Sequence, residues 1–280
     1  MAETTRRAFV CGHPVAHSRS PVIHNYWLRQ LGLAGSYEKI DVPPNEFGAF
    51  LRDFQRMGFV GGNVTLPHKA AAFALASETD EAARLIGAVN TLWVESGKIH
   101  GANTDAPGFL ANLDDRAPQW RRARTATVLG AGGAARAVVY ALKASGMETV
   151  RIVNRTAAKA AELARGFAPG PIAREWNALP SLLRETDLLV NATSLGMGTG
   201  TGPEIDLAAM PAHAVVADIV YVPLETPLLR NARARGLTTV DGLGMLLHQA
   251  VPGFARWFGK RPQVTEELRQ LVIADLGAGK

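Results

Sequence analysis

The sequence predicts an α/β protein of two domains, and three observations support that fold class. The chain has 280 residues, which is long for one core, because single hydrophobic cores stop growing at roughly 250–300 residues. Short β-rich runs alternate with helix-like segments, as they do in open sheets with helices on their faces. The alternation starts again at Thr125, where a strand runs into a glycine-rich turn. We therefore expect an open α/β domain followed by a second domain with its own sheet.

The first domain should alternate strands with helices. Its first helix has well-marked ends, because Ser20 can act as N-cap, Pro21 suits the first turn and Gly32 can stop the helix. A hairpin-like turn at Ser96-Gly97 joins its last two strands. The predicted strands are residues 8–11, 37–42, 59–65, 88–94 and 98–102, and the predicted helices are residues 20–31, 47–57 and a segment that begins just after Pro67.

The second domain should repeat this alternation, and two helices should follow it. In the last helix Thr265 precedes Glu266 and Glu267, and acidic residues favour a helix N-terminus. A loop rich in glycine and threonine is expected at residues 196–203. The predicted strands are residues 125–129, 149–153, 188–191 and 215–219, and the predicted helices are a segment ending near residue 145 and residues 157–165, 244–257 and 265–275.

Composition and charge narrow the function classes. No apolar run approaches the ~20 residues that span a bilayer, and the polar residues 1–7 lead into a strand, so we expect a cytoplasmic protein. The single cysteine, Cys11, excludes a disulfide framework and a cysteine-based zinc site, and no metal is expected. The net charge of +5 invites a nucleic-acid hypothesis. The arginines are scattered, however, and a mildly positive surface also suits small anionic ligands.

A glycine-rich turn follows the first strand of the second domain and opens a helix, which is the context that dinucleotide binding requires. Gly130 permits the tight turn, and Gly132 lets the backbone approach a pyrophosphate. The helix N-terminus then offers N–H groups and a partial positive charge to the phosphates. Ala135 replaces the usual third glycine, which the motif tolerates. The residues expected to hold the dinucleotide here are Gly130, Ala131, Gly132, Gly133 and Ala134.

The end of the next strand indicates which dinucleotide is bound. An NAD-specific site would place an acidic residue there to hold the ribose hydroxyls. This chain has Asn154, Arg155 and Thr156, with Lys159 one turn further on. A carboxylate would repel a 2′-phosphate, whereas a guanidinium binds it through two hydrogen bonds. The sequence therefore favours NADP over NAD.

Polar side chains lie at strand ends and helix starts of the first domain, where open α/β sheets bind ligands. Several have a structural alternative: Ser20 could be only a helix cap, Asn90 an amide at a strand end and Lys69 a solvated lysine. Lys69 stands out because it lies in the first turn of its helix, where the dipole disfavours a cation and thereby favours proton transfer. These candidate site residues are Ser18, Ser20, Asn63, Thr65, Lys69, Asn90 and Asp105.

The motifs together resemble the shikimate dehydrogenase family, in the family's order and over nearly the whole chain. They are HSRSP at residues 17–21, NVTLPHK at 63–69, GAVNT at 87–91, NTD at 103–105, the turn at Gly130, NRT at 154–156, NAT at 191–193, and DGLGM at 241–245 with Gln249. The resemblance implies that the C-terminal helices return to the first domain. The substrate-binding and catalytic domain would be residues 1–105 plus 243–280, and the Rossmann-like NADP-binding domain residues 106–242.

The resemblance also implies an activity and a role for each site residue. The activity is the NADP-dependent, reversible reduction of 3-dehydroshikimate to shikimate, in the pathway to chorismate and the aromatic amino acids. Lys69 and Asp105 would act on the hydroxyl that becomes a ketone. The implied binding residues are Ser18 and Ser20 with Tyr221 for the substrate carboxylate; Thr65, Asn90, Asp105 and Gln249 for ring hydroxyls; Ile219 and Gly242 for the nicotinamide; and Glu81 near the cofactor.

Other functions stay open beside this one. The nearest is a quinate/shikimate or aminoshikimate dehydrogenase, since quinate needs only a slightly roomier pocket. A nucleotide-sensing regulator without catalysis would not need both Lys69 and Asp105. A nucleic-acid binder should show a basic stripe or stacking aromatics. Where the family often has a second arginine this chain has Lys159, which keeps the charge without the fork geometry, so discrimination against NAD should be weaker than usual. The expected assembly is a monomer or a homodimer.

Overall fold

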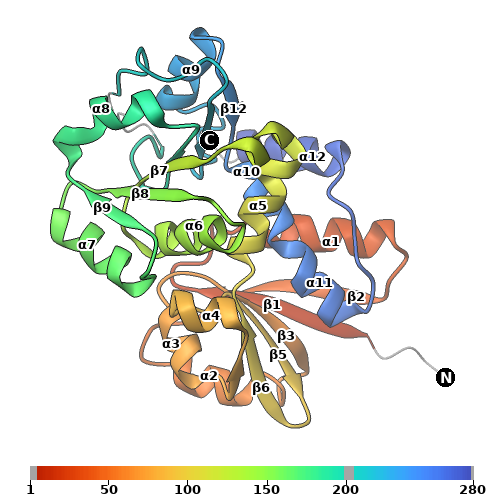
Figure 1. The fold of residues 1–280 in the computed structure, drawn as a ribbon. Helices are drawn as coiled ribbons and strands as arrows, with labels where there is room; N and C mark the ends of the chain where they lie inside the picture. The colour runs from red at the N-terminus through yellow and green to blue at the C-terminus, as the bar shows by residue number, and fades with distance from the viewer. Residues whose placement is uncertain (1–4, 199–204, 279–280) are drawn as a thin grey trace. The chain divides into compact units, whose positions relative to one another are not determined.

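The computed structural model describes residues 5–198 and 205–278. The chain divides into two compact units. The first unit contains the residues up to Thr104 together with those from Gln249 onward, and the second contains Asp105 to His248. Each unit has one six-stranded sheet (Figure 1). The α/β fold class predicted from the sequence is confirmed.

The sheet of the first unit is mixed. Its strand order is β2-β1-β3-β5-β6-β4, and β5 runs antiparallel to both of its neighbours. β1 pairs in parallel with β2 and β3, so the carboxyl ends of these three strands lie at one edge. The strands are β1 (Arg6–Gly12), β2 (Gly35–Asp41), β3 (Phe59–Val64), β4 (Glu78–Thr79), β5 (Thr91–Glu95) and β6 (Lys98–Ala102).

Helices cover both faces of this sheet (Figure 1). On one face Phe9 packs its ring edge-on against Phe50, Phe54 and Phe59. On the other face Trp257, near the C-terminus, donates its indole N–H to the carbonyl of Leu92 over 2.8 Å. The C-terminal helices thus complete the core of the first unit. The helices are α1 (Ser20–Gln30), α2 (Phe47–Asp53), α3 (Lys69–Leu75), α4 (Glu81–Ile86), α11 (Ala250–Phe258) and α12 (Glu266–Ala278).

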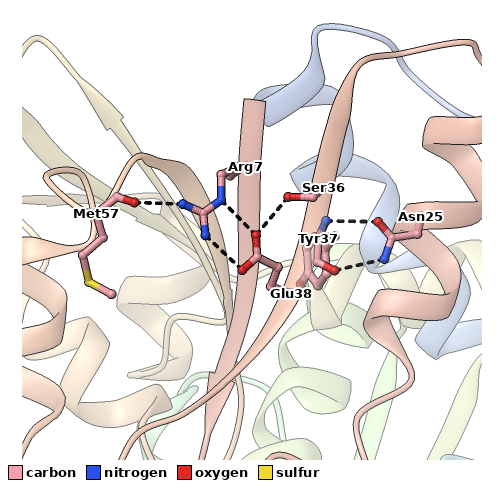
Figure 2. Close-up of polar contacts among 6 residues, drawn as sticks. All are labelled: Arg7, Asn25, Ser36, Tyr37, Glu38 and Met57. Carbon is pink, nitrogen blue, oxygen red and sulfur yellow. Dashed lines mark hydrogen bonds and ion pairs between the residues drawn. The ribbon is translucent and has the colours of Figure 1, made fainter. Parts of the chain in front are cut away.

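The edge strand β2 is fastened to α1 by one side-chain amide (Figure 2). Asn25 accepts from the Tyr37 amide and donates to the Tyr37 carbonyl, each over 3.0 Å. The side chain therefore replaces the missing neighbouring strand and satisfies both main-chain groups. On the other side of β2, the Arg7 guanidinium binds Glu38 through two bonds of 2.9 and 3.0 Å. The bonds from Asn25 fix α1, and with it Ser20, against the sheet, and the Arg7–Glu38 pair holds β2 to β1.

The sheet of the second unit is entirely parallel, with strand order β12-β11-β10-β7-β8-β9. This is the strand order of dinucleotide-binding domains, in which successive strands are added first on one side of the first strand and then, from the fourth strand on, on its other side; the first and fourth strands are here β7 and β10. Ligands bind at that switch point in such sheets. The strands are β7 (Thr125–Leu129), β8 (Thr149–Val153), β9 (Ile172–Arg174), β10 (Leu188–Asn191), β11 (Val215–Asp218) and β12 (Thr238–Val240).

Helices lie in the connections from β7 to β8, β8 to β9, β9 to β10 and β11 to β12, as is usual between parallel strands. Helix α10 packs on α5, and a Cβ on Gly244 at its start would lie 1.8 Å from Oδ1 of Asn112, so a larger residue would displace that side chain. Asn112 in turn donates to the Asp241 carbonyl over 2.8 Å. The helices are α5 (Asp105–Arg116), α6 (Gly133–Ala144), α7 (Ala157–Gly166), α8 (Leu179–Leu182), α9 (Pro227–Ala234) and α10 (Leu243–His248).

Several predictions of local structure were wrong. The strand predicted at residues 88–94 begins at Thr91, and the helix predicted at residues 47–57 ends at Asp53. Ser20 is not an N-cap: the helix begins at Ser20, and the Ser18 hydroxyl accepts from the Ser20 amide over 3.3 Å. The predicted helix 244–257 is two helices, α10 and α11, meeting at Gln249. Pro252 explains the division, because it has no amide hydrogen to donate to the carbonyl of His248.

Two further expectations concern loops and membranes. In the predicted loop 196–203, residues 199–203 lie outside the described residues. Within the part of the chain that the structure describes, no helix is both long and apolar enough to cross a membrane.

Candidate active site

The glycine-rich turn lies at the carboxyl end of β7, beside the ends of both neighbouring strands. Gly130 has a φ of 109°, a region that favours glycine. A Cβ atom there would lie 2.9 Å from the carbonyl oxygen of Ala192, which follows β10. The Gly130 amide also donates to the carbonyl of Val153, the last residue of β8, over 2.8 Å. Gly130 thus holds the turn at the switch point, where a larger residue would displace main chain.

The helix after the turn, α6, presents an open N-terminus. Gly132 precedes it in an extended conformation, and no side chain of the described residues caps it. A Cβ built on Gly132 or Gly133 would have no heavy atom within 4 Å. Ala135, in contrast, is fully buried and holds the helix close to the sheet. Main-chain amides and a partial positive charge next to open space suit a phosphate group.

The end of β8 brings cationic side chains next to this turn. β8 pairs with β7, so Val153 lies opposite Leu129, and the next residues emerge beside the glycines. Arg155, Thr156 and Lys159 are exposed there. Asn154 donates to the Thr156 carbonyl over 2.9 Å, which shapes the connection into α7. The predicted NADP-selecting residues therefore share one edge of the second sheet with the glycine turn.

A buried carboxylate organises the loops after β10 and β11. Asp218 accepts from the Asn191 side chain (2.9 Å), the Val220 amide (3.0 Å) and the Thr226 hydroxyl (2.7 Å). Burial raises the pKa of Asp218 above its usual value, and these three bonds oppose that rise. Thr226 also caps α9 by accepting from the Leu229 amide. The network fixes the main chain that carries Ile219 and Tyr221.

Ile219 and Gly242, both predicted to line the nicotinamide, lie next to each other in the structure. A Cβ on Gly242 would lie 2.2 Å from the Ile219 carbonyl oxygen, so only glycine fits there. The Ile219 amide donates to the Asn191 carbonyl over 3.0 Å, which places this pair beside the end of β10. Tyr221 is half-buried in the same loop.

In the first unit a chain of buried hydrogen bonds begins at Tyr37. Its hydroxyl donates to Oδ1 of Asn63 over 2.5 Å, and burial raises the pKa of Tyr37 well above its usual value. Because Oδ1 of Asn63 accepts, Nδ2 must donate, and it does so to the Asn90 carbonyl (3.0 Å) and the Thr91 hydroxyl (3.1 Å). The Tyr37 ring stacks on His24 with centroids 4.0 Å apart. Burial lowers the pKa of His24 to about 3, so this ring stays neutral.

The same network sets the orientation of the Asn90 side chain. Its Oδ1 accepts from the Thr104 amide (2.8 Å), the Thr104 hydroxyl (3.1 Å) and the Thr91 hydroxyl (3.1 Å). The carbonyl end of the amide therefore faces Thr104, and the donor end lies on the other side. The Thr104 hydroxyl is also 3.5 Å from Oε1 of Gln249. The Thr104 hydroxyl thus lies between these two acceptor oxygens, and its one hydrogen can be donated to only one of them at a time.

Lys69 is the first residue of α3 and is half-buried. Its carbonyl accepts from the Val89 amide over 3.0 Å, so its main chain lies beside the segment that leads to Asn90. Asp105 is half-buried at the start of α5 and follows Thr104 directly in the chain. Glu81 is exposed at the start of α4, which Asp80 caps by accepting from the Ala83 amide.

The predicted substrate residues divide between the two units. Those of the first unit are Ser18, Ser20, Thr65, Lys69, Asn90 and Gln249, and those of the second are Asp105 and Tyr221. Sequence reasoning assigned no role to Tyr37, Thr104 or Asp218. Asp218 had a detectable signal, since a carboxylate that ends an apolar strand needs several donors. Tyr37 and Thr104 had none, because their partners are distant in sequence.

The strand order, the glycine turn and the cationic strand end define a dinucleotide-binding oxidoreductase of the Rossmann type. Residues 10–92 match the family described as "Shikimate dehydrogenase substrate binding domain". Residues 114–198 match "Shikimate / quinate 5-dehydrogenase", and residues 242–272 match "Shikimate 5'-dehydrogenase C-terminal domain". The chain belongs to the shikimate dehydrogenase family.

Individual relatives agree with this membership. The chain is 60% identical to "Shikimate dehydrogenase (NADP(+))" of Chelativorans sp. (strain BNC1), with 100% of both chains covered. It is similar to the crystal structure of shikimate 5-dehydrogenase from Thermus thermophilus in complex with NADP(H) and shikimate, with a TM-score of 0.87, 40% identity, and 96% of this chain and 99% of that chain covered. It is also similar to quinate dehydrogenase from Corynebacterium glutamicum in complex with NAD, with a TM-score of 0.89, 30% identity and the same coverage of both chains.

Proposed function

We propose that this protein is an NADP-dependent shikimate dehydrogenase, which interconverts 3-dehydroshikimate and shikimate. The observation that carries the proposal is the 60% identity, over the full length of both chains, to a relative named as the NADP(+) enzyme. The exposed Arg155 beside the glycine turn supports the choice of cofactor, because a guanidinium pairs well with a 2′-phosphate.

The second unit would hold NADP. The open α6 N-terminus, with Gly130, Ala131, Gly132, Gly133 and Ala134, would take the pyrophosphate, and no Cβ obstructs it at Gly132 or Gly133. The group that takes the 2′-phosphate would be Asn154, Arg155, Thr156 and Lys159. Ile219 and Gly242 would line the nicotinamide position, and Glu81 would lie near the cofactor. When bound, NADP supplies the hydride chemistry.

The first unit would hold the substrate by its polar groups. Ser18 and Ser20 would bind the carboxylate, with help from Tyr221. Thr65, Asn90, Asp105 and Gln249 would bind ring hydroxyls. Because Oδ1 of Asn90 already accepts from Thr104, Asn90 would act as a donor to the substrate.

Lys69 and Asp105 would act on the hydroxyl that becomes a ketone. That hydroxyl must lose its proton on oxidation, and in reverse the carbonyl oxygen gains negative charge. A cationic Lys69 stabilises this charge more in the transition state than in the ground state. Asp105 would anchor the adjacent hydroxyl and influence the protonation of Lys69.

Quinate is the second candidate substrate, because the structure resembles a quinate dehydrogenase bound to NAD as closely as it resembles shikimate enzymes. Assaying shikimate and quinate, each with NADP⁺ and with NAD⁺, decides between them. We expect the highest kcat/KM for shikimate with NADP⁺, followed at the NADPH absorbance. A higher value for quinate with NAD⁺ would overturn the assignment.

We also propose the domain roles, the location and the assembly. Residues 1–105 with 243–280 would form the substrate-binding and catalytic domain, and residues 106–242 the NADP-binding domain. We expect a cytoplasmic enzyme, consistent with a single cysteine that is buried and unpaired. It should be a monomer or a homodimer that binds neither nucleic acid nor membranes, which size-exclusion chromatography with light scattering and cell fractionation would test.

A further inference from the structure

A short loop, residues 13–19, connects β1 to α1 in the first unit and carries Ser18, while Ser20 opens the helix. A binding site made of two serine hydroxyls requires an ordered loop, because ordering it at the moment of binding weakens affinity. Two side chains at the end of β2, Asp41 and Lys39, hold this loop.

Asp41 binds the first half of the loop with both carboxylate oxygens. It is the last residue of β2 and pairs in register with Gly12, the last residue of β1. Its Oδ1 accepts from the Val15 amide over 2.9 Å, and its Oδ2 lies 2.9 Å from Nδ1 of the His13 ring. The bonds from His13 and Val15 lower the pKa of Asp41 below its usual value, so the carboxylate is ionised and accepts from both donors.

Lys39 binds the next residue of the loop. Its Nζ donates to the Ala16 carbonyl over 2.6 Å. Lys39 and Asp41 are two residues apart on a strand, so both side chains leave the same face of the sheet. Ile40, between them, packs on the opposite side in the core around Phe9. The alternation of β2 thus directs one acceptor and one donor to the loop.

Val15, which Asp41 binds, is connected to Ser18 by a main-chain hydrogen bond. The side chain of Val15 is buried, and its carbonyl accepts from the Ser18 amide over 3.0 Å. The Ser18 hydroxyl in turn accepts from the Ser20 amide. Two hydrogen bonds therefore lead from the Asp41 carboxylate to the main chain of Ser18, and a third joins the two serines.

We propose that Asp41 is a positioning residue for the substrate carboxylate, acting with Lys39 by holding Ser18 and Ser20 in their binding geometry. The inference rests on the proposed function, in which these serines bind that carboxylate. Asp41 itself makes no contact with the reacting atoms in this role. Its loss should therefore weaken substrate binding and leave the chemical step intact, because interactions equal in ground and transition states change KM and not kcat.

The test is steady-state kinetics of Asp41→Ala with shikimate and NADP⁺. We expect KM for shikimate to rise about five- to tenfold, since each neutral or charge-assisted bond is modest and tenfold corresponds to ~1.4 kcal/mol. kcat and KM for NADP⁺ should stay within about twofold of wild type. Asp53→Ala is the matched control, because its side chain is 52% exposed against 51% for Asp41, and it pairs with Arg56, three residues further along the chain.

A double-mutant cycle distinguishes positioning from a merely structural role. If Asp41 acts through Ser18, Asp41→Ala should add little to the KM of Ser18→Ala, whereas independent effects add. Additive effects, an unchanged KM for shikimate or an equal rise in KM for NADP⁺ would overturn the proposal. If Asp41→Ala lowers the Tm, Lys39→Met takes its place with the same expectations, since it removes the bond to Ala16 and leaves Asp41 in place.

Failure of the proposed function would look different. Wild-type protein would then not turn over shikimate with NADP⁺ at all. In that case the binding of shikimate, measured by calorimetry on wild type and Asp41→Ala, decides this inference: equal affinities, or no affinity in either protein, would refute it.

Discussion

In the second unit the glycine turn offers main-chain amides, and Arg155 and Lys159 beside it are exposed. In the first unit Asn63, Asn90 and Thr104 are buried and hydrogen-bonded to one another. The first arrangement depends on local main-chain conformation, so its residues are nearly consecutive. The second depends on side chains from several strands and their ends, and on Gln249, which directly precedes α11. A mutation in the turn should therefore act on cofactor binding or folding, and a mutation in the network on substrate binding.

The largest expected effect lies on the substrate side. Lys69→Ala should lower kcat by about 10²–10⁴-fold, the usual range for a group that handles a proton in the transition state. KM for shikimate should change much less. Rapid-mixing or steady-state assays at the NADPH absorbance measure both. Lys98→Ala, which removes an exposed lysine paired with Glu78, is the control and should retain wild-type turnover.

Substitutions at two glycines of the turn should have different effects, one on stability and the other on cofactor binding. Gly130→Ala should lower the free energy of unfolding by about 2 kcal/mol or more, because φ is positive there and a Cβ meets main chain. Gly132→Ala should leave the Tm near that of wild type, since its Cβ meets nothing within 4 Å. It should raise KM for NADP⁺ instead, because the methyl group occupies space intended for phosphate. Equal losses of Tm in the two variants would contradict this division.

These two regions also differ in how much the sequence revealed. The glycine turn, the strand 149–153 and Arg155 were predictable because local spacing determines main-chain conformation and the strand end. The boundaries of β8 and β10 agree with the predicted ones. Asn63 and Asn90 were recognisable only as polar residues at strand ends. The bond of Asn63 to Tyr37 joins residues 26 positions apart, and the bond of Asn90 to Thr104 joins residues 14 apart. No local pattern encodes such pairings.

A third test examines the cofactor specificity of the second unit. Arg155→Ala should raise KM for NADP⁺ about 10–100-fold, which corresponds to the loss of one or two charge-assisted bonds. KM for NAD⁺ should stay unchanged or fall, because NAD has no 2′-phosphate. Arg174→Ala, on the exposed edge strand β9, is the control. An equal change for both cofactors would place Arg155 outside the specificity site.

Removing the Tyr37 hydroxyl should destabilise the buried hydrogen-bond network around Asn63 and Asn90. Tyr37→Phe leaves Oδ1 of Asn63 without its donor, and an unsatisfied buried acceptor costs about 1–3 kcal/mol. KM for shikimate should rise a few-fold, since Asn63 supports Asn90 through the Asn90 carbonyl and Thr91. Tyr26→Phe is a matched control: its hydroxyl is buried and has no hydrogen-bond partner among the described residues, so removing it should not destabilise the protein.

We expect the smallest effect, on stability, from the ion pair between Arg7 and Glu38 near the edge strand β2 of the first unit. The hydrogen bond from Arg7, the main cause, holds the pKa of Glu38 below its usual value. A lowered folded-state pKa stabilises the protein above the unfolded pKa, and this contribution is lost as pH falls through the folded pKa. Both side chains are more than a third exposed, so solvent screening keeps the contribution of the pair small. Urea unfolding should show Glu38→Gln less stable than wild type at pH 7, with the difference shrinking below pH 4.5. A constant difference across that range would mean that the loss comes from the bond of Glu38 to Ser36 and not from its charge.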